Sequence, residues 1–84
     1  MERVKMDKKN FSLCMNLHKL LKEKIKGRIF VTFYMGTLTM HINAGKGIKY
    51  FRNLNEDLTR YNVEKIADFI EYDYRRFIRE IFFN

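Results

Sequence analysis

Residues 28–42 have the sequence RIFVTFYMGTLTMHI, and its alternation of apolar and polar side chains decides the fold. Such alternation is typical of a β-strand with one buried face. The Gly36–Thr37 pair predicts a two-residue type II′ turn that joins two antiparallel strands. With that turn, the apolar side chains of both strands share one face, which supports the same register independently. The cross-strand pairs predicted on this face are Met35–Leu38, Phe33–Met40 and Val31–Ile42.

A third strand is predicted at about residues 48–52, after a loop at residues 44–47, and it extends the hairpin into a meander. Its facing stays open, because Tyr50 and Phe51 are adjacent and either can point into the core. The sequence around this strand has glycines at positions 45 and 47 and a lysine between them. This loop lacks the remaining residues of a phosphate-binding P-loop, so it is interpreted as a strand connection.

Helical periodicity occurs on both sides of the strands. The first helix is predicted to begin within residues 7–12 and to end at Gly27, a natural C-cap. A short turn at residues 55–60 precedes a long helix over residues 61–83, which has Asn62 as its N-cap. One stripe of the long helix has the spacing of a core-facing surface. It consists of Val63, Ile66, Ala67, Ile70, Tyr74, Phe77, Ile78 and Ile81.

The resulting order is α-β-β-β-α in a single domain over residues 1–84. Two helices on one face of a three-stranded antiparallel sheet bury all of the apolar stripes at once. The predicted fold is therefore a small two-layer α+β sandwich.

Composition limits the class of protein. Hydrophobic residues make up 46% of the chain and aromatic residues 15%, which is too apolar for a disordered chain. The apolar runs are too short to cross a bilayer, and the charged start does not resemble a secretion signal. We therefore expect a cytoplasmic protein, located in the host cytoplasm if it is viral. The richness in Lys, Ile, Asn, Phe and Tyr is common in AT-rich genomes, including those of phages.

Neither catalysis nor metal binding is predicted. Cys14 and His18 are four residues apart and can meet on a helix. Cys14 lies in the apolar arc of that helix, however, and a buried thiol is usually inert. The second histidine, His41, belongs to a different element, so no cluster of zinc ligands forms. The sequence predicts no enzyme activity, no cofactor and no metal site.

Charge is distributed unevenly along the chain. Residues 1–52 contain twelve Lys/Arg and three Asp/Glu, a balance of +9, whereas residues 53–84 contain five and seven, a balance of −2. A basic half favours polyanionic partners, with nucleic acid first and acidic protein surfaces second. Direct nucleic-acid binding is one hypothesis that follows. Its candidate residues are Lys19, Lys22, Lys26, Lys46, Lys49 and Arg52.

The hairpin offers a second candidate surface, on the face that points away from the helices. Its candidate residues are Phe30, Tyr34 and His41. Exposed aromatic side chains on a sheet stack bases in several RNA-binding and single-strand-binding proteins. The competing interpretations are packing of Tyr34 against Thr39 and of Thr32 against His41, or homodimerisation through this face.

The long helix has a second stripe, opposite its core stripe, and it combines aromatic residues with arginines. These residue types are enriched at interface hot spots. The stripe predicts a partner-binding surface made of Phe69, Tyr72, Arg75, Arg76, Arg79 and Phe83. The leading hypothesis is a non-enzymatic phage or mobile-element protein that docks on a host protein or nucleoprotein, as inhibitors and anti-defence proteins do. A homodimeric interaction module is a third possibility.

Overall fold

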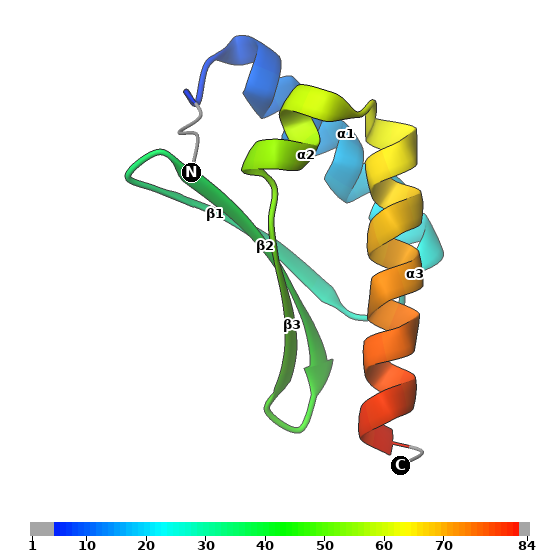
Figure 1. Cartoon of the computed structure of the whole chain (residues 1–84). Helices are drawn as coiled ribbons and strands as arrows, with labels where there is room; N and C mark the ends of the chain where they lie inside the picture. The colour runs from blue at the N-terminus through cyan, green and yellow to red at the C-terminus, as the bar shows by residue number, and fades with distance from the viewer. Residues whose placement is uncertain (1–4, 83–84) are drawn as a thin grey trace.

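The structure is a computed structural model that describes residues 5–82. Three strands form one antiparallel sheet in the order β1-β2-β3, and the helices lie on one face of it (Figure 1). This confirms the predicted α+β fold, with a short additional helix between the sheet and the long helix. The elements are α1 (Lys8–Lys24), β1 (Arg28–Tyr34), β2 (Thr37–Gly45), β3 (Ile48–Asn53), α2 (Asn55–Arg60) and α3 (Val63–Phe82).

The predicted turn of the β1–β2 hairpin is wrong. The turn lies one residue earlier than predicted, and the register of the two strands changes with it. Tyr34 pairs with Thr37, so the turn consists of Met35 and Gly36. Both have positive φ, +49° and +81°, as a type I′ turn requires, and this turn matches the twist of paired strands. Each pair therefore shifts by two positions, which leaves the paired side chains on their predicted faces, but Met35, predicted on the inner face opposite Leu38, lies in the turn and is 67% exposed. The observed pairs are Phe33–Leu38, Val31–Met40 and Ile29–Ile42 on the inner face, and Thr32–Thr39 and Phe30–His41 on the outer face.

A contact from α2 explains why the turn forms one residue early. The side chain of Asn55 is buried, with an exposed fraction of 2%. Its Oδ1 accepts the N–H of Leu38 at 2.9 Å, and its Nδ2 donates to the carbonyl of Gly36 at 3.0 Å. Asn55 therefore does not cap α2, whose N-cap position is Leu54. Its amide instead fixes the backbone at the end of the hairpin.

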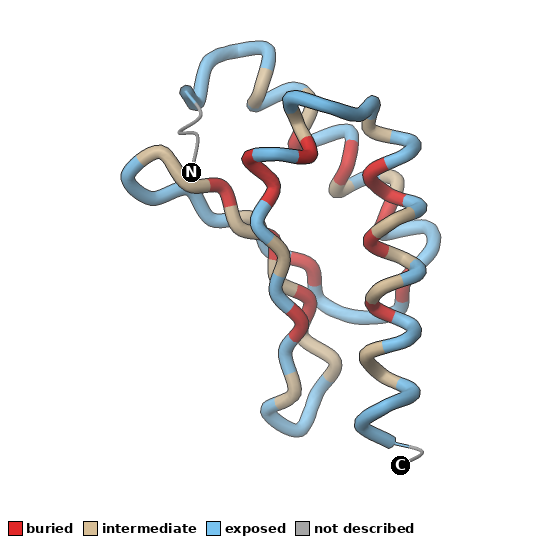
Figure 2. Tube along the Cα trace, viewed as in Figure 1, coloured by how far each residue is buried: buried red, intermediate tan, exposed pale blue. Residues whose placement is uncertain are grey.

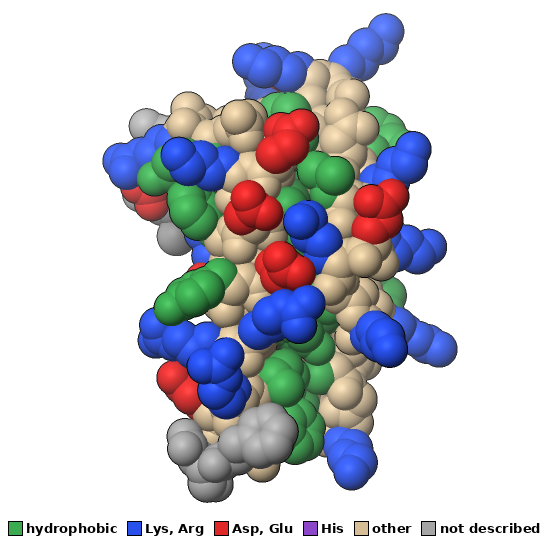
Figure 3. Space-filling model, turned by 90° about the vertical axis from the view of Figure 1, so that its right-hand side faces the viewer, with side chains coloured by type: hydrophobic (Ala, Val, Ile, Leu, Met, Phe, Trp, Pro, Cys, Tyr) green, Lys and Arg blue, Asp and Glu red, His purple; other side chains and the backbone are tan. Residues whose placement is uncertain are grey.

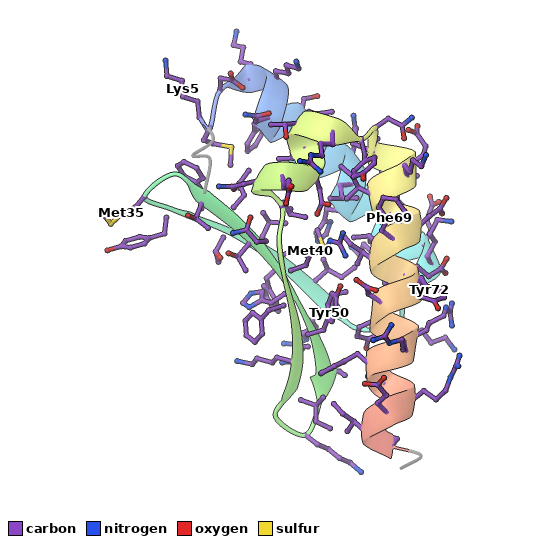
Figure 4. All side chains as sticks on the ribbon, in the orientation of Figure 1. Lys5, Met35, Met40, Tyr50, Phe69 and Tyr72 are labelled. Carbon is purple, nitrogen blue, oxygen red and sulfur yellow. The ribbon has the colours of Figure 1, made fainter. Side chains whose placement is uncertain are left out.

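The core lies between the sheet and the helices (Figure 2), and it contains buried apolar side chains from every element except α2, whose half-buried Leu58 packs against it. Tyr50 points into it at 8% exposure, whereas Phe51 is 60% exposed on the outer face, which settles the facing of β3. In Figure 4, Tyr50 lies between the sheet and α3. The buried apolar side chains are Cys14, Leu17, Leu21, Ile25, Ile29, Leu38, Met40, Ile42, Tyr50, Leu54, Ile66, Ala67, Ile70 and Tyr74.

The helix N-termini agree with the sequence, but the predicted C-terminus of α1 is wrong. Asp7 caps α1 by accepting the N–H of Asn10 at 2.8 Å, and Asn62 accepts the N–H of Lys65 at 2.9 Å at the start of α3. The first helix ends at Lys24 instead of Gly27, because Ile25 is already extended and buries its side chain beside the sheet.

The last turn of α3 is less buried than its periodicity predicts. Ile81 is 42% exposed and Phe82 is 48% exposed, so the core stripe does not extend to Ile81 as predicted. The early end of α1 at Lys24 is the physical reason, because α3 continues past it with no helix alongside. The part of α3 that continues past the end of α1 is called the overhang below. Its apolar surface is left partly uncovered.

Candidate functional site

The predicted stripe on the outer side of α3 is not one continuous surface. Tyr72 is 68% exposed and points away from the sheet (Figure 4). Phe69 is half-buried, because its ring packs edge-to-face against Tyr61 with the centroids 5.0 Å apart. Phe83 lies outside the described residues. Of the predicted aromatic anchors, Tyr72 is therefore the exposed one within residues 5–82.

The arginines of the stripe differ in their surroundings. Arg75 donates to the carbonyl of Lys24 at 3.2 Å and to Glu71 at 3.1 Å, which ties α3 to the end of α1. Arg76 forms an exposed i, i+4 pair with Glu80 at 3.3 Å. Arg79 makes no ion pair with any residue that the structure describes. Arg75 and Arg79 therefore flank the overhang, whereas Arg76 is at the back of the helix.

An apolar groove lies beside the overhang, between α3, the end of α1 and the end of β2. Its main hollow has a volume of about 370 Å³, and a second hollow of about 280 Å³ continues it along α3. We call this site the α3 groove. Its floor consists of Ile25, Ala44, Tyr74, Ile78 and Phe82, and its rim consists of Lys24, Lys26, Arg75 and Arg79.

The rim of the α3 groove is cationic. Lys24 lies 3.6 Å from Asp68, and Arg75 is paired with Glu71, so two of the four rim charges are partly compensated. Lys26 and Arg79 have no ion-pair partner within residues 5–82. Figure 3 shows the result as apolar side chains in the lower half of this face with basic side chains around them. The arrangement can hold an apolar side chain and attract carboxylates at the same time.

A larger hollow of about 630 Å³ lies between α2 and α3, but its charges are already compensated. Arg52 bridges Asp57 and Asp73 with N···O distances of 2.8 and 2.6 Å, and Arg60 pairs with Glu56 at 3.0 Å. Arg52 therefore joins β3 to both following helices. Its guanidinium is held on the inner side of the sheet, apart from the phosphate-binding set in which the sequence placed it.

The other cations predicted to bind nucleic acid do not form one surface. Lys19 and Lys22 are exposed on α1, which covers the inner face of the sheet. Lys49 is exposed on β3, in the row that pairs with Asn43 on the outer face. Lys46 lies in the β2–β3 loop with a φ of +55°, and Lys26 belongs to the rim of the α3 groove. The six predicted cations are thus divided among five places: the surface of α1, the rim of the α3 groove, the β2–β3 loop, the outer face of the sheet and its inner side.

Cys14 is buried in the core, and His18 contacts the backbone of β1. Cys14 is 7% exposed, and this burial raises the pKa of its thiol. His18 Nε2 lies 3.1 Å from the carbonyl oxygen of Ile29 and links α1 to β1. A raised thiol pKa reduces the thiolate that is available at neutral pH, and the thiolate is the reactive form.

We therefore expect Cys14 to react slowly with Ellman's reagent in the native protein. The rate at pH 7.5 should be about tenfold or more below that in denaturant, because burial both hides the sulfur and disfavours the thiolate. Equal rates in the two conditions, measured by absorbance, would show that Cys14 is accessible and would contradict the burial of this helix face.

In comparisons with known proteins, no family model, no curated protein sequence and no solved structure matches this chain. Within residues 5–82, no helix is long and apolar enough to cross a bilayer, and no three His, Cys, Asp or Glu side chains gather as metal ligands.

Proposed function

We propose that the protein is a binding protein whose α3 groove holds an acidic, apolar segment of a partner protein. The observation that carries this proposal is the overhang of α3, which leaves Ile78 and Phe82 in a groove rimmed by Lys26 and Arg79, two cations with no ion-pair partner among the described residues 5–82. An apolar floor supplies binding energy when it is covered, and the cationic rim selects carboxylates at its edge.

In this proposal the last helix still binds the partner, as the sequence predicts, but through the α3 groove instead of the predicted stripe. Of the predicted stripe, Phe69 and Tyr72 line the larger hollow between α2 and α3, whose charges are compensated, and Arg76 forms an exposed pair with Glu80. Aromatic and arginine anchors act best when they line a pocket that excludes water. The α3 groove, on the flank of the helix, forms such a pocket. Arg75 and Arg79 belong both to the predicted stripe and to the rim of this groove. Docking of this kind suits an inhibitor of a host protein or nucleoprotein, since it requires no chemistry.

A fluorescent peptide tests the proposal directly. The probe is about 15 residues long, with Leu at helical spacing and Glu elsewhere, a length at which an isolated helix begins to be stable. A second peptide replaces every Glu with Lys. We expect the Glu peptide to bind and the Lys peptide to bind at least about tenfold more weakly, because the rim is cationic.

Matched variants identify the side of α3 that binds. Phe82→Ala removes an exposed ring from the groove, and Tyr72→Ala removes an exposed ring from the back of the same helix. We expect about a tenfold loss of Glu-peptide affinity for Phe82→Ala, as for an interface hot spot, and little change for Tyr72→Ala. Lys26→Glu should weaken binding more than Lys19→Glu. Loss of binding in Tyr72→Ala but not in Phe82→Ala would place the interface on the predicted stripe instead.

A further inference from the structure

The uncovered face of the sheet has three transverse rows of side chains. Strand pairing places Arg28 beside Asn43 and Asn43 beside Lys49, which forms a basic row. Two residues along each strand, Phe30, His41 and Phe51 form an aromatic row. A third row, two residues further on, has the polar side chains of Thr32, Thr39 and Asn53. This surface is called the outer sheet face below.

The aromatic row is continuous across the sheet. The rings of Phe30 and His41 have centroids 5.0 Å apart, and those of His41 and Phe51 are 5.6 Å apart. Phe30 is 45% exposed and Phe51 is 60% exposed, so ring surface faces solvent at both ends of the row. Tyr34, which the sequence grouped with Phe30 and His41, lies at the turn and is 76% exposed, apart from the row. Tyr34 is therefore on the outer face of β1 as predicted, but the third ring of the row is Phe51.

The charge of the outer sheet face is of one sign. Residues 24–55 contain no Asp or Glu, and all three strands lie within this range. Arg28 and Lys49 are exposed, and neither forms an ion pair with any residue between Lys5 and Phe82. A hollow of about 220 Å³ lies where the basic and aromatic rows meet, lined by Phe30, His41, Asn43 and Lys49.

Rings and cations at this spacing fit one class of ligand. Adjacent rows on one face of a sheet are about 7 Å apart along the strands. A nucleotide whose base stacks on the aromatic row can therefore place its phosphate over the basic row. Stacking requires the open face of a base, which a double helix hides between neighbouring base pairs. The ligand that can contact both rows in this way is therefore a single-stranded nucleic acid.

We propose that the outer sheet face binds single-stranded nucleic acid, with bases stacked on Phe30, His41 and Phe51 and phosphates held by Arg28 and Lys49. Base–aromatic stacking tolerates any sequence, because every base has a flat face. The site lies on the opposite side of the sheet from the helices, so it is independent of the α3 groove. A protein with both sites can contact a nucleoprotein through its two components.

Fluorescence anisotropy with labelled oligonucleotides of about 12 nucleotides tests this site, a length within the range that small single-strand-binding domains cover. The probes are oligo-dT, oligo-U and a mixed-sequence DNA duplex of the same length. We expect both single strands to bind more tightly than the duplex at low salt. The affinity should fall as salt rises, by roughly 0.7 logarithmic units per phosphate contact for each tenfold increase in salt concentration.

Two matched comparisons separate stacking and charge from general effects. Phe51→Ala should lose about tenfold in affinity, as expected for one stacked base, whereas Tyr72→Ala on α3 should not change it. Lys49→Gln should weaken binding and reduce the salt slope by about 0.7, whereas Lys19→Gln removes the same charge from α1 and should leave the slope unchanged. Phe51 and Lys49 are exposed, and thermal melting of each variant checks that the fold is retained.

Three results would overturn the proposal. The first is no binding of either single strand at low salt, and the second is duplex binding as tight as single-strand binding. The third is wild-type affinity in both Phe51→Ala and Lys49→Gln. If sedimentation shows a dimer that Phe51→Ala converts to a monomer while oligonucleotide affinity stays unchanged, the outer sheet face is a self-association surface instead. None of these results depends on the α3 groove, so the two proposals fail separately.

Discussion

Replacement of Arg52 by Met destabilises the protein by about 3 kcal/mol, the largest effect that we expect from any single side chain outside the apolar core. The guanidinium donates to both carboxylate oxygens of Asp57, at 2.8 and 3.1 Å, and to Asp73 at 2.6 Å. The side chains of Arg52 and Asp57 are only 22% and 10% exposed, so water screens this pair weakly. Its loss would leave the Asp57 carboxylate, whose side chain is only 10% exposed, without a close counter-charge.

The same geometry keeps Arg52 charged throughout the accessible pH range. The hydrogen bonds that Arg52 donates to Asp57 raise the pKa of Arg52 further above its already high ordinary value, against the opposing effect of burial. The network therefore joins β3, α2 and α3 at any pH at which Asp57 and Asp73 are ionised. Tyr50 lies beside it, with its hydroxyl 3.5 Å from Asp73, and burial raises the pKa of that hydroxyl.

Urea unfolding of the variant beside a matched control measures this effect. Arg76→Met removes another arginine that pairs with a carboxylate, but Arg76 and Glu80 are 63% and 59% exposed. Exposed i, i+4 pairs contribute about 0.3–0.5 kcal/mol, so this control should be nearly as stable as the wild type. If Arg52→Met costs no more than Arg76→Met, the bridge does not hold the two layers together and this account of α2 is wrong.

Replacement of Asn55 by Ala destabilises the protein by about 2 kcal/mol and loosens the β1–β2 turn. The amide satisfies a backbone N–H and a backbone carbonyl of the hairpin, on Leu38 and Gly36, in a site with 2% exposure. Removal of one partner from a buried hydrogen bond costs about 1–3 kcal/mol for each group left unsatisfied, and relaxation or water entry reduces the sum.

The control for Asn55 is Asn16→Ala, on the exposed surface of α1. Alanine has the higher helix propensity, so this variant should be as stable as the wild type or more stable by up to about 0.5 kcal/mol. Amide hydrogen exchange adds a local measurement, because exchange at Leu38 should accelerate in Asn55→Ala more than exchange in α1. Equal stability of the two variants, with Leu38 still protected, would show that the turn forms without this amide.

Local sequence patterns were sufficient for much of the fold. The apolar alternation of residues 28–42 identifies the buried face, and Asp7 and Asn62 occupy the cap positions that they favour. The position of the turn, in contrast, could not be predicted from the local sequence. Gly36 suits both a Gly36–Thr37 turn and a Met35–Gly36 turn, and Asn55 is 17 residues from Leu38 in the chain. The contact that favours the observed register is therefore a tertiary one.

The candidate sites required the structure for a similar reason. The adjacent aromatics Tyr50 and Phe51 left the facing of β3 open, and with it the side of the sheet on which Arg52 and Lys49 lie. The α3 groove depends on where α1 ends relative to α3, which no periodicity within α3 reveals. The absence of acidic residues over residues 24–55, in contrast, was visible in the sequence and identifies the strands as the cationic part of the fold.

Binding of an acidic, apolar segment in the α3 groove is tested most directly by an NMR titration. The ¹⁵N-labelled protein is titrated with the Glu/Leu peptide while the backbone amide shifts are followed. The proposal predicts that the largest shift changes cluster at Ile25, Lys26, Ala44, Ile78 and Phe82, and that the Lys/Leu peptide does not reproduce them. Shift changes centred on Tyr72 and Arg76 at the back of α3, or none at saturating peptide, would contradict it.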